Sequence, residues 1–319
     1  MPNIVKKQVL TGIYLVRIPL PFRLDHVNCY LLEGNGGWTV IDTGLHNQST
    51  VNIWEKMLEG RLVQNIVITH YHPDHYGYAG GLQEKTRAPV WMSQTDAENG
   101  LRSWETAHID RIRRHYPACG LPELLANQMV ANTESFLSLI TPHPKIEHYL
   151  QDGETVNLGW ERYTVITTPG HSDGMLCFYN KLNKVLFSAD HILPKITPNI
   201  SYWFHGDPNP LQSYLDALHK VKKLDIEIVL PSHGEPFYNA HERIDEIVHH
   251  HHERLDKVLD VTRSERTVYE VCLQLFGDRL NVHEMRFAIG ETIAHLEYLV
   301  QQGEMKKEEI RGKWLYANL

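Results

Sequence analysis

The sequence predicts a mixed α/β protein with one large domain, residues 1–262, and a small C-terminal domain, residues 263–319. Short apolar segments of strand length are followed by helical segments, and this order occurs twice in the large domain. The last part of the chain has a different order, with two helical stretches before a hairpin pattern. A chain of 319 residues is long enough to bury a sizeable core in the first unit and to add the second.

The first half of the large domain alternates strand and turn signals. Strands are expected over residues 13–18, 27–32, 38–41, 64–69 and 89–92, with a tight turn at 34–37 and a helix over 48–58. Residues from about 94 to 138 then have a helical composition without strand runs. Pro117 and the stretch Gly120-Leu121-Pro122 divide this helical insertion into two expected helices.

The second half of the large domain repeats the strand-then-helix order. Strands are expected over 154–158, 163–167, 175–179, 184–188 and 227–230, a helix over 210–222, and a long helix over 241–261. Four consecutive histidines, residues 249–252, lie inside the long helix. Apolar residues recur around them at helical spacing, at Ile244, Ile247 and Leu255, so the four histidines are expected on one exposed helix face.

The C-terminal segment resembles a winged-helix module in its order of elements. Helices are expected over 267–276 and 283–302, and segments 304–310 and 313–317 flank the hairpin signal Arg311-Gly312. Residues 264–319 carry 7 lysines and arginines against 9 acidic residues, which disfavours DNA binding. A structural or dimerising appendage is the favoured interpretation.

Composition excludes several classes of protein. The hydrophobic content of 42% and charged content of 22% are typical of a globular protein, and the formal net charge of −8 argues against a general nucleic-acid or anionic membrane partner. No stretch approaches about 18 apolar residues, and the N-terminus lacks the pattern of a signal peptide. The four cysteines, at 29, 119, 177 and 272, form no close pair, which predicts a reducing, cytoplasmic setting.

A dense cluster of polar side chains follows the apolar run 66–68. It is the stretch Thr69-His70-Tyr71-His72-Pro73-Asp74-His75. Imidazoles and carboxylates are costly to crowd together unless a cation organises them. His70 and His72 project to the same side of an extended backbone, and Asp74 and His75 belong to the following turn and helix. The spacing favours a metal site over a polar loop that is merely rich in histidine.

Three further turns carry possible ligands, and each follows a predicted strand. They are Thr168-Pro169-Gly170-His171-Ser172, Ser188-Ala189-Asp190-His191 and Pro231-Ser232-His233-Gly234. Proline and glycine lie in the first and the third of these turns and let the backbone bend sharply at the strand end. One such residue alone more often caps a loop, but four ligand-bearing turns together predict a metal centre.

The four turns, over residues 10 to 240, resemble the metallo-β-lactamase superfamily, in its binuclear glyoxalase II-like branch. The resemblance implies an αββα sandwich, an α/β (α+β) fold with two sheets face to face and helices outside. It implies that His70, His72 and His171 bind one metal, that Asp74, His75 and His233 bind a second, and that Asp190 bridges both. Asp42, in Ile41-Asp42-Thr43-Gly44, matches the buried aspartate that braces the metal loop in this family.

Histidine and aspartate donors suit two Zn²⁺ ions, although Fe or Mn remain open. Two such cations about 3.5–4 Å apart share a bridging hydroxide that is available near neutral pH. We therefore expect a metal-dependent hydrolase of small-molecule esters, thioesters or lactones, with Asp74 orienting the hydroxide. The absence of cysteine at the ligand positions disfavours a thiolate-containing lactamase site.

Several alternatives remain open at the level of sequence. The tail also resembles that of a mitochondrial endoribonuclease of the superfamily, which keeps a phosphodiesterase open as an alternative, although the negative charge disfavours RNA. A lactonase has the same ligand set, and a non-enzymatic binding protein is disfavoured because all seven ligand positions hold competent residues. The oligomeric state is open, with the helical insertion and the tail as possible contact surfaces of a homo-oligomer. Residues expected either to line a pocket or to pack against the main domain are Tyr71, Tyr76, Trp104, His108, Arg111, Arg114, His115, Tyr116, Trp203, Phe204 and His205.

Overall fold

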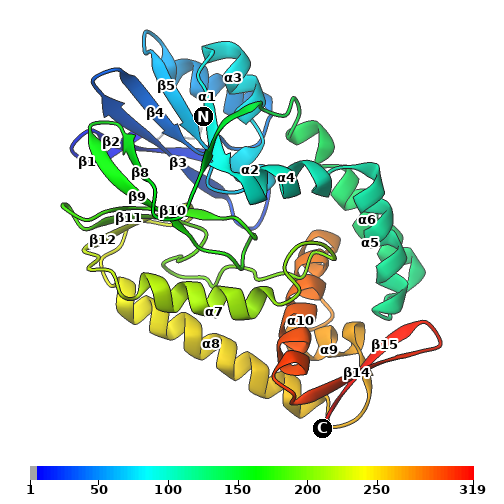
Figure 1. Cartoon of the computed structure of the whole chain (residues 1–319). Coiled ribbons are helices and arrows are strands. Elements are labelled where there is room, and N and C mark those ends of the chain that lie inside the picture. Colours follow the sequence, from blue (N-terminus) through cyan, green and yellow to red (C-terminus); the bar gives the residue numbers. More distant parts are fainter. Residues whose placement is uncertain (1–5) are drawn as a thin grey trace.

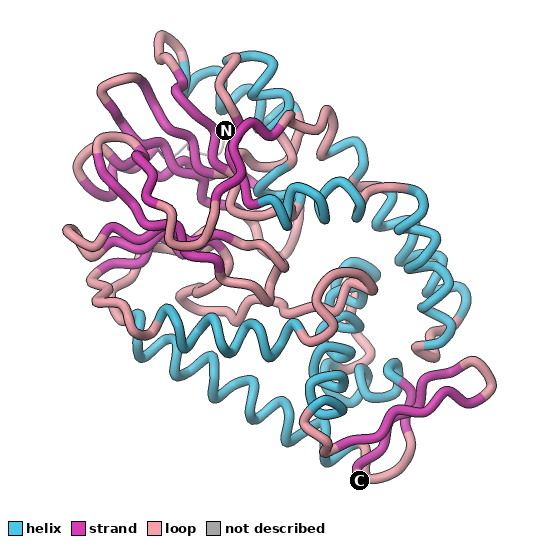
Figure 2. Tube along the Cα trace, in the orientation of Figure 1, coloured by secondary structure: helices cyan, strands magenta, loops and turns pink. Residues whose placement is uncertain are grey.

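The computed structural model describes residues 6–319 and shows four layers in the order α, β, β, α. Two β-sheets lie face to face, with helices on the outer side of each (Figure 1, Figure 2). The predicted αββα sandwich is confirmed.

The first sheet has seven strands in sequence order. The four N-terminal strands pair antiparallel, and the connections from β4 onward are parallel. Its strands are β1 (Lys6–Leu10), β2 (Ile13–Pro19), β3 (His26–Gly34), β4 (Gly37–Ile41), β5 (Val63–Val67), β6 (Val90–Ser93) and β7 (Ile146–Leu150). The carboxyl ends of β4, β5 and β6 therefore lie at one edge of the sheet, where the chain turns out toward the metal-ligand loops.

The second sheet has five strands in the order β12-β11-β10-β9-β8. Only β11 and β12 are parallel, and the other neighbours pair antiparallel. Its strands are β8 (Thr155–Leu158), β9 (Glu161–Thr167), β10 (Leu176–Asn180), β11 (Val185–Ala189) and β12 (Ile228–Pro231).

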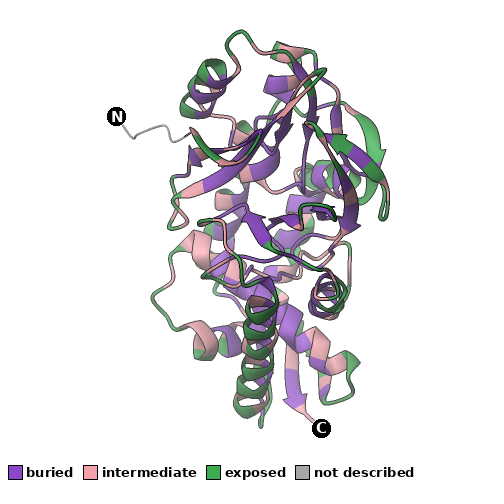
Figure 3. Ribbon diagram, turned by 90° about the vertical axis from the view of Figure 1, so that its left-hand side faces the viewer, coloured by how far each residue is buried: buried purple, intermediate pink, exposed green. Residues whose placement is uncertain are grey.

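Alternation along the strands divides the core between the layers. In β3, Tyr30 and Leu32 face the second sheet, whereas Cys29 and Leu31 face the helices outside the first. The strands of both sheets are mostly buried, and the outer helices are exposed on one side only (Figure 3). The covering helices are α1 (Gln48–Leu58), α2 (Pro73–Tyr76) and α3 (Ala79–Thr86) on the first sheet, and α7 (Pro210–Val221) and α8 (Ala240–Val261) on the second.

The sequence pattern does not indicate the edge strands β1 and β7. Both have mainly exposed or partly exposed side chains, so neither has the apolar alternation that identifies a half-buried strand. Their pairing comes from backbone hydrogen bonds to β2 and β6, which a reading of side chains cannot detect.

The helical insertion contains three α-helices instead of the expected two. They are α4 (Gln94–Ser103), α5 (Thr106–Ala118) and α6 (Glu123–Glu134), followed by the short 3₁₀ turn η1 (Leu137–Leu139). Pro117 lies in the last turn of α5 and does not end it, and the unpredicted break falls at Trp104 and Glu105, where no glycine or proline marks it. These helices arch from the first sheet to the C-terminal segment (Figure 1).

The C-terminal segment packs its helices against the rest of the chain. The helices α9 (Val268–Phe276) and α10 (Val282–Gln301) precede a three-stranded sheet of β13 (Arg266–Thr267), β15 (Lys313–Asn318) and β14 (Met305–Ile310). Contacts of α10 reach α6, α7 and α8. A paired hydrogen-bond cap begins each helix, Thr267 with Glu270 and Asn281 with Glu284.

The expectation that residues 249–252 lie on one exposed face is wrong. His249 is exposed, but His251 is fully buried, and its Nδ1 lies 3.1 Å from Nε2 of His295. Successive residues of an α-helix are about 100° apart, so four in a row surround the helix and one must face inward.

All four cysteines are free and buried. Among the described residues, none of the helices combines the length and apolarity needed to span a bilayer.

Gly80 in α3 provides a test of how tightly the helices outside the first sheet pack. A Cβ at Gly80 would lie 1.9 Å from the carbonyl oxygen of Pro142. We expect Gly80→Ala to lower the free energy of unfolding by about 1–3 kcal/mol, because the backbone clash outweighs the better helix propensity of alanine. Chemical denaturation measures this change. Glu84→Ala, at an exposed position of the same helix, is the control and should stay within about 0.5 kcal/mol. Equal stability of Gly80→Ala and wild type would contradict the packing.

Candidate metal centre

The first ligand loop leaves the carboxyl end of β5 and runs directly into α2. His72 is the extended residue before that helix, with φ −63° and ψ 147°, and Pro73 occupies its first position, where a missing N–H costs no hydrogen bond. His70 and His72 point to the same side, and their atoms Nε2 and Nδ1 lie 3.1 Å apart. Asp74 and His75 follow from the single turn of α2.

The other three ligand loops follow β9, β11 and β12. His171 comes after Gly170, which has φ +130° and lies so close to α7 that a Cβ would be 2.3 Å from Cβ of Tyr214. Asp190 directly follows Ala189, which has a left-handed φ of +47°. His233 precedes Gly234 in the loop after β12. Each backbone bend is a position where the chain leaves its strand and turns toward the first loop.

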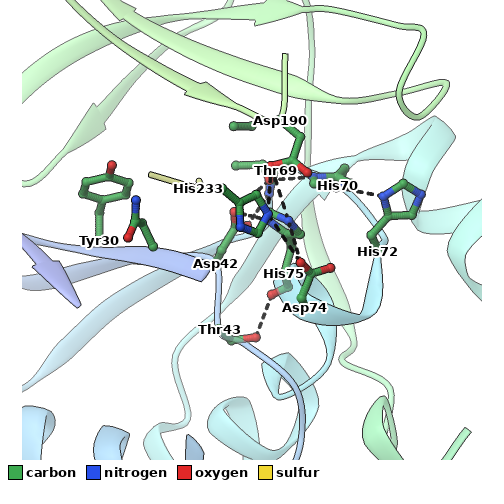
Figure 4. A network of polar contacts seen from close by, with 12 residues as sticks. Tyr30, Asp42, Thr43, Thr69, His70, His72, Asp74, His75, Asp190 and His233 are labelled. Atoms are coloured by element: carbon green, nitrogen blue, oxygen red, sulfur yellow. Dashed lines mark hydrogen bonds and ion pairs between the residues drawn. The ribbon is translucent and has the colours of Figure 1, made fainter. Parts of the chain in front are cut away.

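The structure brings all seven predicted side chains together. Ligand atoms that lie within 4.8 Å of one another form three groups: His70, His72 and His171; His70, His75 and Asp190; and Asp74, His75 and His233. Figure 4 shows the second and third of these groups, with Asp190 on one side of the imidazoles and Asp74 on the other.

The carboxylate of Asp190 lies between the groups. Its Oδ2 is 3.3 Å from Nε2 of His171, and its Oδ1 is 3.6 Å from Nε2 of His75 and 3.4 Å from Nε2 of His233. Oδ2 of Asp74 closes the second group at 3.6 Å from His75 and 3.5 Å from His233. One oxygen of Asp190 thus faces each side of the cluster.

Hydrogen bonds at Nδ1 fix the direction of four imidazoles. His75 donates to Asp42 at 2.8 Å, and His171 and His233 donate to the carbonyls of Asn199 and His26, each at 2.7 Å. His70 bonds Thr69 Oγ1 at 3.0 Å. These four rings therefore turn Nε2 toward the centre, as metal-binding histidines do when an outer partner holds Nδ1. His72 presents Nδ1 instead.

Asp42 at the end of β4 braces the first loop. It has a left-handed φ of +58° and is buried. Its Oδ1 accepts from the Thr69 backbone N–H at 2.9 Å, and its Oδ2 accepts from the Thr69 hydroxyl and from His75 at 2.8 Å each. One carboxylate thereby positions both ends of the loop, without pointing at the centre itself.

Buried atoms without hydrogen-bond partners test whether the centre fits a cation. Nε2 of His75, Nε2 of His233 and Oδ1 of Asp190 are all buried and lack a partner. Buried polar atoms are rarely left in this state, and all three face one another. A cation between them would satisfy all three at once, so the residues fit a divalent metal.

The ionisation of His70, His72 and Asp190 agrees with that fit. Burial lowers the pKa of His70 and of His72 well below the ordinary value, and neighbouring imidazoles add to the effect, so both rings are neutral donors. Burial opposes ionisation of Asp190, but the imidazoles of His233 and His75 hold the pKa of that carboxyl well below its usual range. Neutral imidazoles and ionised carboxylates are the forms that bind Zn²⁺. Burial opposes protonation of His75 and of His233, but the nearby carboxylates raise the pKa of both rings, so a metal would displace a proton from each.

Comparison with known proteins places this centre in a family. The model of the metallo-beta-lactamase superfamily matches residues 22–233, well over half of the chain. The chain belongs to the metallo-beta-lactamase superfamily. A second model, described as the metallo-beta-lactamase-like C-terminal domain, matches residues 255–318. As a member of this superfamily, the chain is a metallo-hydrolase.

Two solved structures are similar over nearly the whole chain. A metallo-beta-lactamase family protein from Thermus thermophilus is 31% identical, covers 98% of this chain and 100% of its own, and has a TM-score of 0.87. A beta-lactamase domain protein from Burkholderia ambifaria is 30% identical, covers 100% and 96%, and has a TM-score of 0.89.

Some curated relatives are named as hydrolases. The probable metallo-hydrolase YqjP of Bacillus subtilis is 24% identical over 89% of this chain and 91% of its own. Two further relatives are named thioesterases. The acyl-coenzyme A thioesterase MBLAC2 of Homo sapiens is 30% identical over 52% of this chain and 58% of its own. The atrochrysone carboxyl ACP thioesterase of Aspergillus fumigatus is 21% identical over 78% and 65%.

Asp96, in the first turn of α4, joins two ligand loops and was missed by sequence reasoning. Its Oδ2 accepts from the Ser172 hydroxyl at 2.6 Å and from the Tyr71 backbone N–H at 3.3 Å, and its Oδ1 accepts from Gly174 N–H at 2.6 Å. Burial raises the pKa of Asp96 to about 7. In the sequence, Asp96 is marked only by the helix-start pattern Ser93 to Asp96. That pattern indicates a helix N-cap, not a residue that holds two loops together.

A pocket of about 620 Å³, with mainly apolar walls, opens on the metal centre. Its lining includes the metal-centre residues His72, Asp74, His171, Asp190 and His233. The remaining walls come from the loop after β2, the helical insertion, the segment before α7, and α9 and α10 of the C-terminal segment. The volume is in the range of small-molecule sites.

The structure divides the predicted pocket residues into two sets. Four of them lie outside the pocket. Tyr76 is buried among the residues outside the first sheet, where it contacts His143. Arg111 and Arg114 are exposed to solvent, and His115 packs on Trp314. Helical periodicity places these residues on the other faces of their helices. The residues that do line the pocket are Tyr71, Trp104, His108, Tyr116, Trp203, Phe204 and His205.

Asp96→Ala tests the tie between the two loops. It leaves buried N–H and hydroxyl groups without an acceptor, so we expect a loss of about 3 kcal/mol in unfolding free energy and a fall of roughly 10–100-fold in Zn²⁺ affinity. Chemical denaturation and competition with a zinc chelator measure the two effects.

Asp96→Asn retains one acceptor oxygen and should lose less of both quantities. Glu98→Ala, exposed on the same helix, is the control and should leave both unchanged. Wild-type zinc affinity in a folded Asp96→Ala variant would show that the tie does not position the ligands.

Proposed function

We propose that this protein is a binuclear metal-dependent hydrolase of small-molecule thioesters, within a wider range of esters and lactones. One observation carries the proposal: seven donors converge with Asp190 between two groups, at the inner end of a largely apolar pocket. His70, His72 and His171 would hold one metal and Asp74, His75 and His233 the other. Zn²⁺ is the metal we expect, and the donor set would also accept Fe or Mn.

Two bound cations would supply a hydroxide nucleophile at neutral pH and stabilise negative charge on the carbonyl oxygen. The protein's own residues do the rest. Asp74 lines the pocket beside the second group, where its carboxylate orients the nucleophile, accepts its proton and returns that proton to the departing thiolate. The apolar walls bind the substrate and exclude bulk water from the acyl carbon.

Two observations support thioesters as the substrate class. The pocket walls are mainly apolar and aromatic, which suits an acyl chain. Two of the relatives that this chain is similar to are named thioesterases. The donor set of five imidazoles and two carboxylates, without cysteine, also supports our assignment to the glyoxalase II-like branch.

We also infer that the C-terminal segment is a winged-helix-like module that does not bind nucleic acid. The hairpin β14–β15 follows two helices, as in such modules. The second helix, which would enter a DNA groove, is instead buried along most of its length and lines the pocket. This placement supports a small-molecule hydrolase over the endoribonuclease alternative. The free, buried cysteines support the inferred cytoplasmic location.

Metal content and turnover should be lost together. We expect chelation to abolish hydrolysis and added Zn²⁺ to restore it. We expect His72→Ala and Asp190→Ala to lower both bound metal and kcat/KM, the latter by at least about 100-fold. Metal analysis and steady-state kinetics on the same preparations measure this. His249→Ala, an exposed histidine away from the centre, is the control. Normal turnover in metal-free protein would overturn the proposal.

Substrate class is tested by a matched screen. The zinc- and manganese-loaded proteins are assayed with an acyl thioester, the matching lactone, a phosphodiester and single-stranded RNA. We expect thioester cleavage that depends little on salt. RNA cleavage that falls steeply with salt, and no thioester cleavage, would assign the protein to the nuclease class instead.

A further inference from the structure

Arg286, on α10, is a buried cation in the wall of the active-site pocket. Its exposed fraction is 8%, and it lines the same pocket as the metal-centre residues His72 and Asp190. The centre lies in the large domain, whereas Arg286 comes from the C-terminal segment. The metal chemistry proposed above gives Arg286 no role.

Arg286 has no counter-ion among the residues that the structure describes. Among residues 6–319 no carboxylate forms an ion pair with it, and its Nε has no hydrogen-bond partner. The two acidic residues nearest to it on α10 are engaged elsewhere. Glu284 caps the start of the helix, and Glu291 pairs with Arg254 at 3.1 Å.

The neighbouring hydroxyl of Tyr116 does not supply a negative charge either. Burial raises the pKa of Tyr116, so its phenol stays neutral beside the guanidinium. An unpaired buried charge is costly, and proteins keep such a group where a ligand completes it.

Aromatic rings hold the guanidinium in place without neutralising it. The guanidinium carbon lies 5.3 Å from the ring centre of Phe136, 4.8 Å from that of Phe287 and 5.9 Å from that of Trp203. These contacts orient a planar cation and leave its N–H groups for a partner in the pocket. The Trp203 ring is in turn 5.8 Å from the ring of His72. A single aromatic side chain therefore separates the cation from the metal centre.

Resting on the thioesterase function proposed above, we propose that Arg286 binds an anionic group of the substrate. The substrate class is thus a thioester that carries a carboxylate or a phosphate, with its acyl carbonyl at the metal centre. The guanidinium fork pairs with the two oxygens of either anion, and Phe136 and Phe287 cover the apolar part between the two ends. The C-terminal segment would then select the substrate, and the large domain would cleave it.

The test compares thioesters that differ only in the anion. The reference substrate is the N-acetylcysteamine thioester of a straight-chain acid with a methyl end. One partner carries a terminal carboxylate on the same acyl chain, and the other replaces N-acetylcysteamine by coenzyme A, which places phosphates on the thiol half. We expect wild type to favour one anionic partner by about tenfold or more in kcat/KM.

Variants of Arg286 should remove this preference. Arg286→Met keeps the length of the side chain and should reduce the ratio of anionic to neutral kcat/KM to near one, whereas Arg286→Lys should give an intermediate ratio. Arg311→Met, at the exposed tip of the β14–β15 hairpin, is the control and should keep the wild-type ratio. A wild-type ratio in folded Arg286→Met, or no preference in wild type, overturns the inference.

A stability measurement separates binding from a structural role. Removal of an unpaired buried charge should leave the melting temperature of Arg286→Met equal to or above that of wild type. A much lower melting temperature, with no loss of anion preference in Arg286→Lys, would show that Arg286 serves packing only.

A binding measurement on metal-free protein distinguishes failure of this inference from failure of the proposed function. Trp104 and Trp203 line the pocket, so tryptophan fluorescence reports its occupancy. The free dicarboxylic acid and coenzyme A are titrated against wild type and Arg286→Met. Binding that requires Arg286, in a protein that cleaves no thioester, would support the anion site and overturn the thioesterase proposal. Absence of both binding and cleavage would overturn both.

Discussion

The carboxylate of Asp190 is the constraint on which the rest of the structure depends. It lies 3.3 to 3.6 Å from three imidazoles: His171 after β9, His75 in α2 after β5, and His233 after β12. Such crowding of buried polar groups is unfavourable unless every outer atom is bonded and the inner atoms share a cation. The surroundings meet the first condition for the three imidazoles that lie nearest to Asp190. Asp42, the Asn199 carbonyl and the His26 carbonyl each fix one ring from behind.

The αββα sandwich is what allows ligands from distant parts of the sequence to meet. The loop of His233 ends a strand of the second sheet, yet residues of the first sheet hold it. Asn28 donates to the carbonyls of Pro231 and Gly234, and the Tyr30 hydroxyl donates to Pro231. Face-to-face packing therefore positions the candidate metal centre directly, through hydrogen bonds that cross from one sheet to the other. The left-handed backbone of Asp42 is tolerated because three hydrogen bonds to its carboxylate fix this residue against the first loop.

The parts of the site that sequence could predict are those encoded by short spacing. The alternation of His70 and His72, followed by a helix start at Pro73, fixes a local geometry, so the loop could be assigned from its own residues. Helix α1 likewise has the limits that its pattern indicates, residues 48 to 58. Asp96 and Arg286 could not be found in this way. The groups that bond Asp96, and two of the three rings around Arg286, lie far away in sequence. A lone aspartate or arginine on a helix has the same pattern as one that faces water.

The C-terminal segment is coupled to the metal centre as well as to the pocket. Arg254 on α8 pairs with Glu291 on α10, whose other oxygen accepts from the Asn199 side chain at 2.9 Å. The backbone carbonyl of Asn199 in turn holds His171 at 2.7 Å. One short chain of hydrogen bonds thus connects the helix that carries Arg286 to a ring at the centre. A substitution of Glu291 would therefore act through the orientation of His171, whereas a substitution of Arg286 would act on what is bound. The two effects separate in kinetics, because the first lowers kcat for every substrate and the second changes the ratio between substrates.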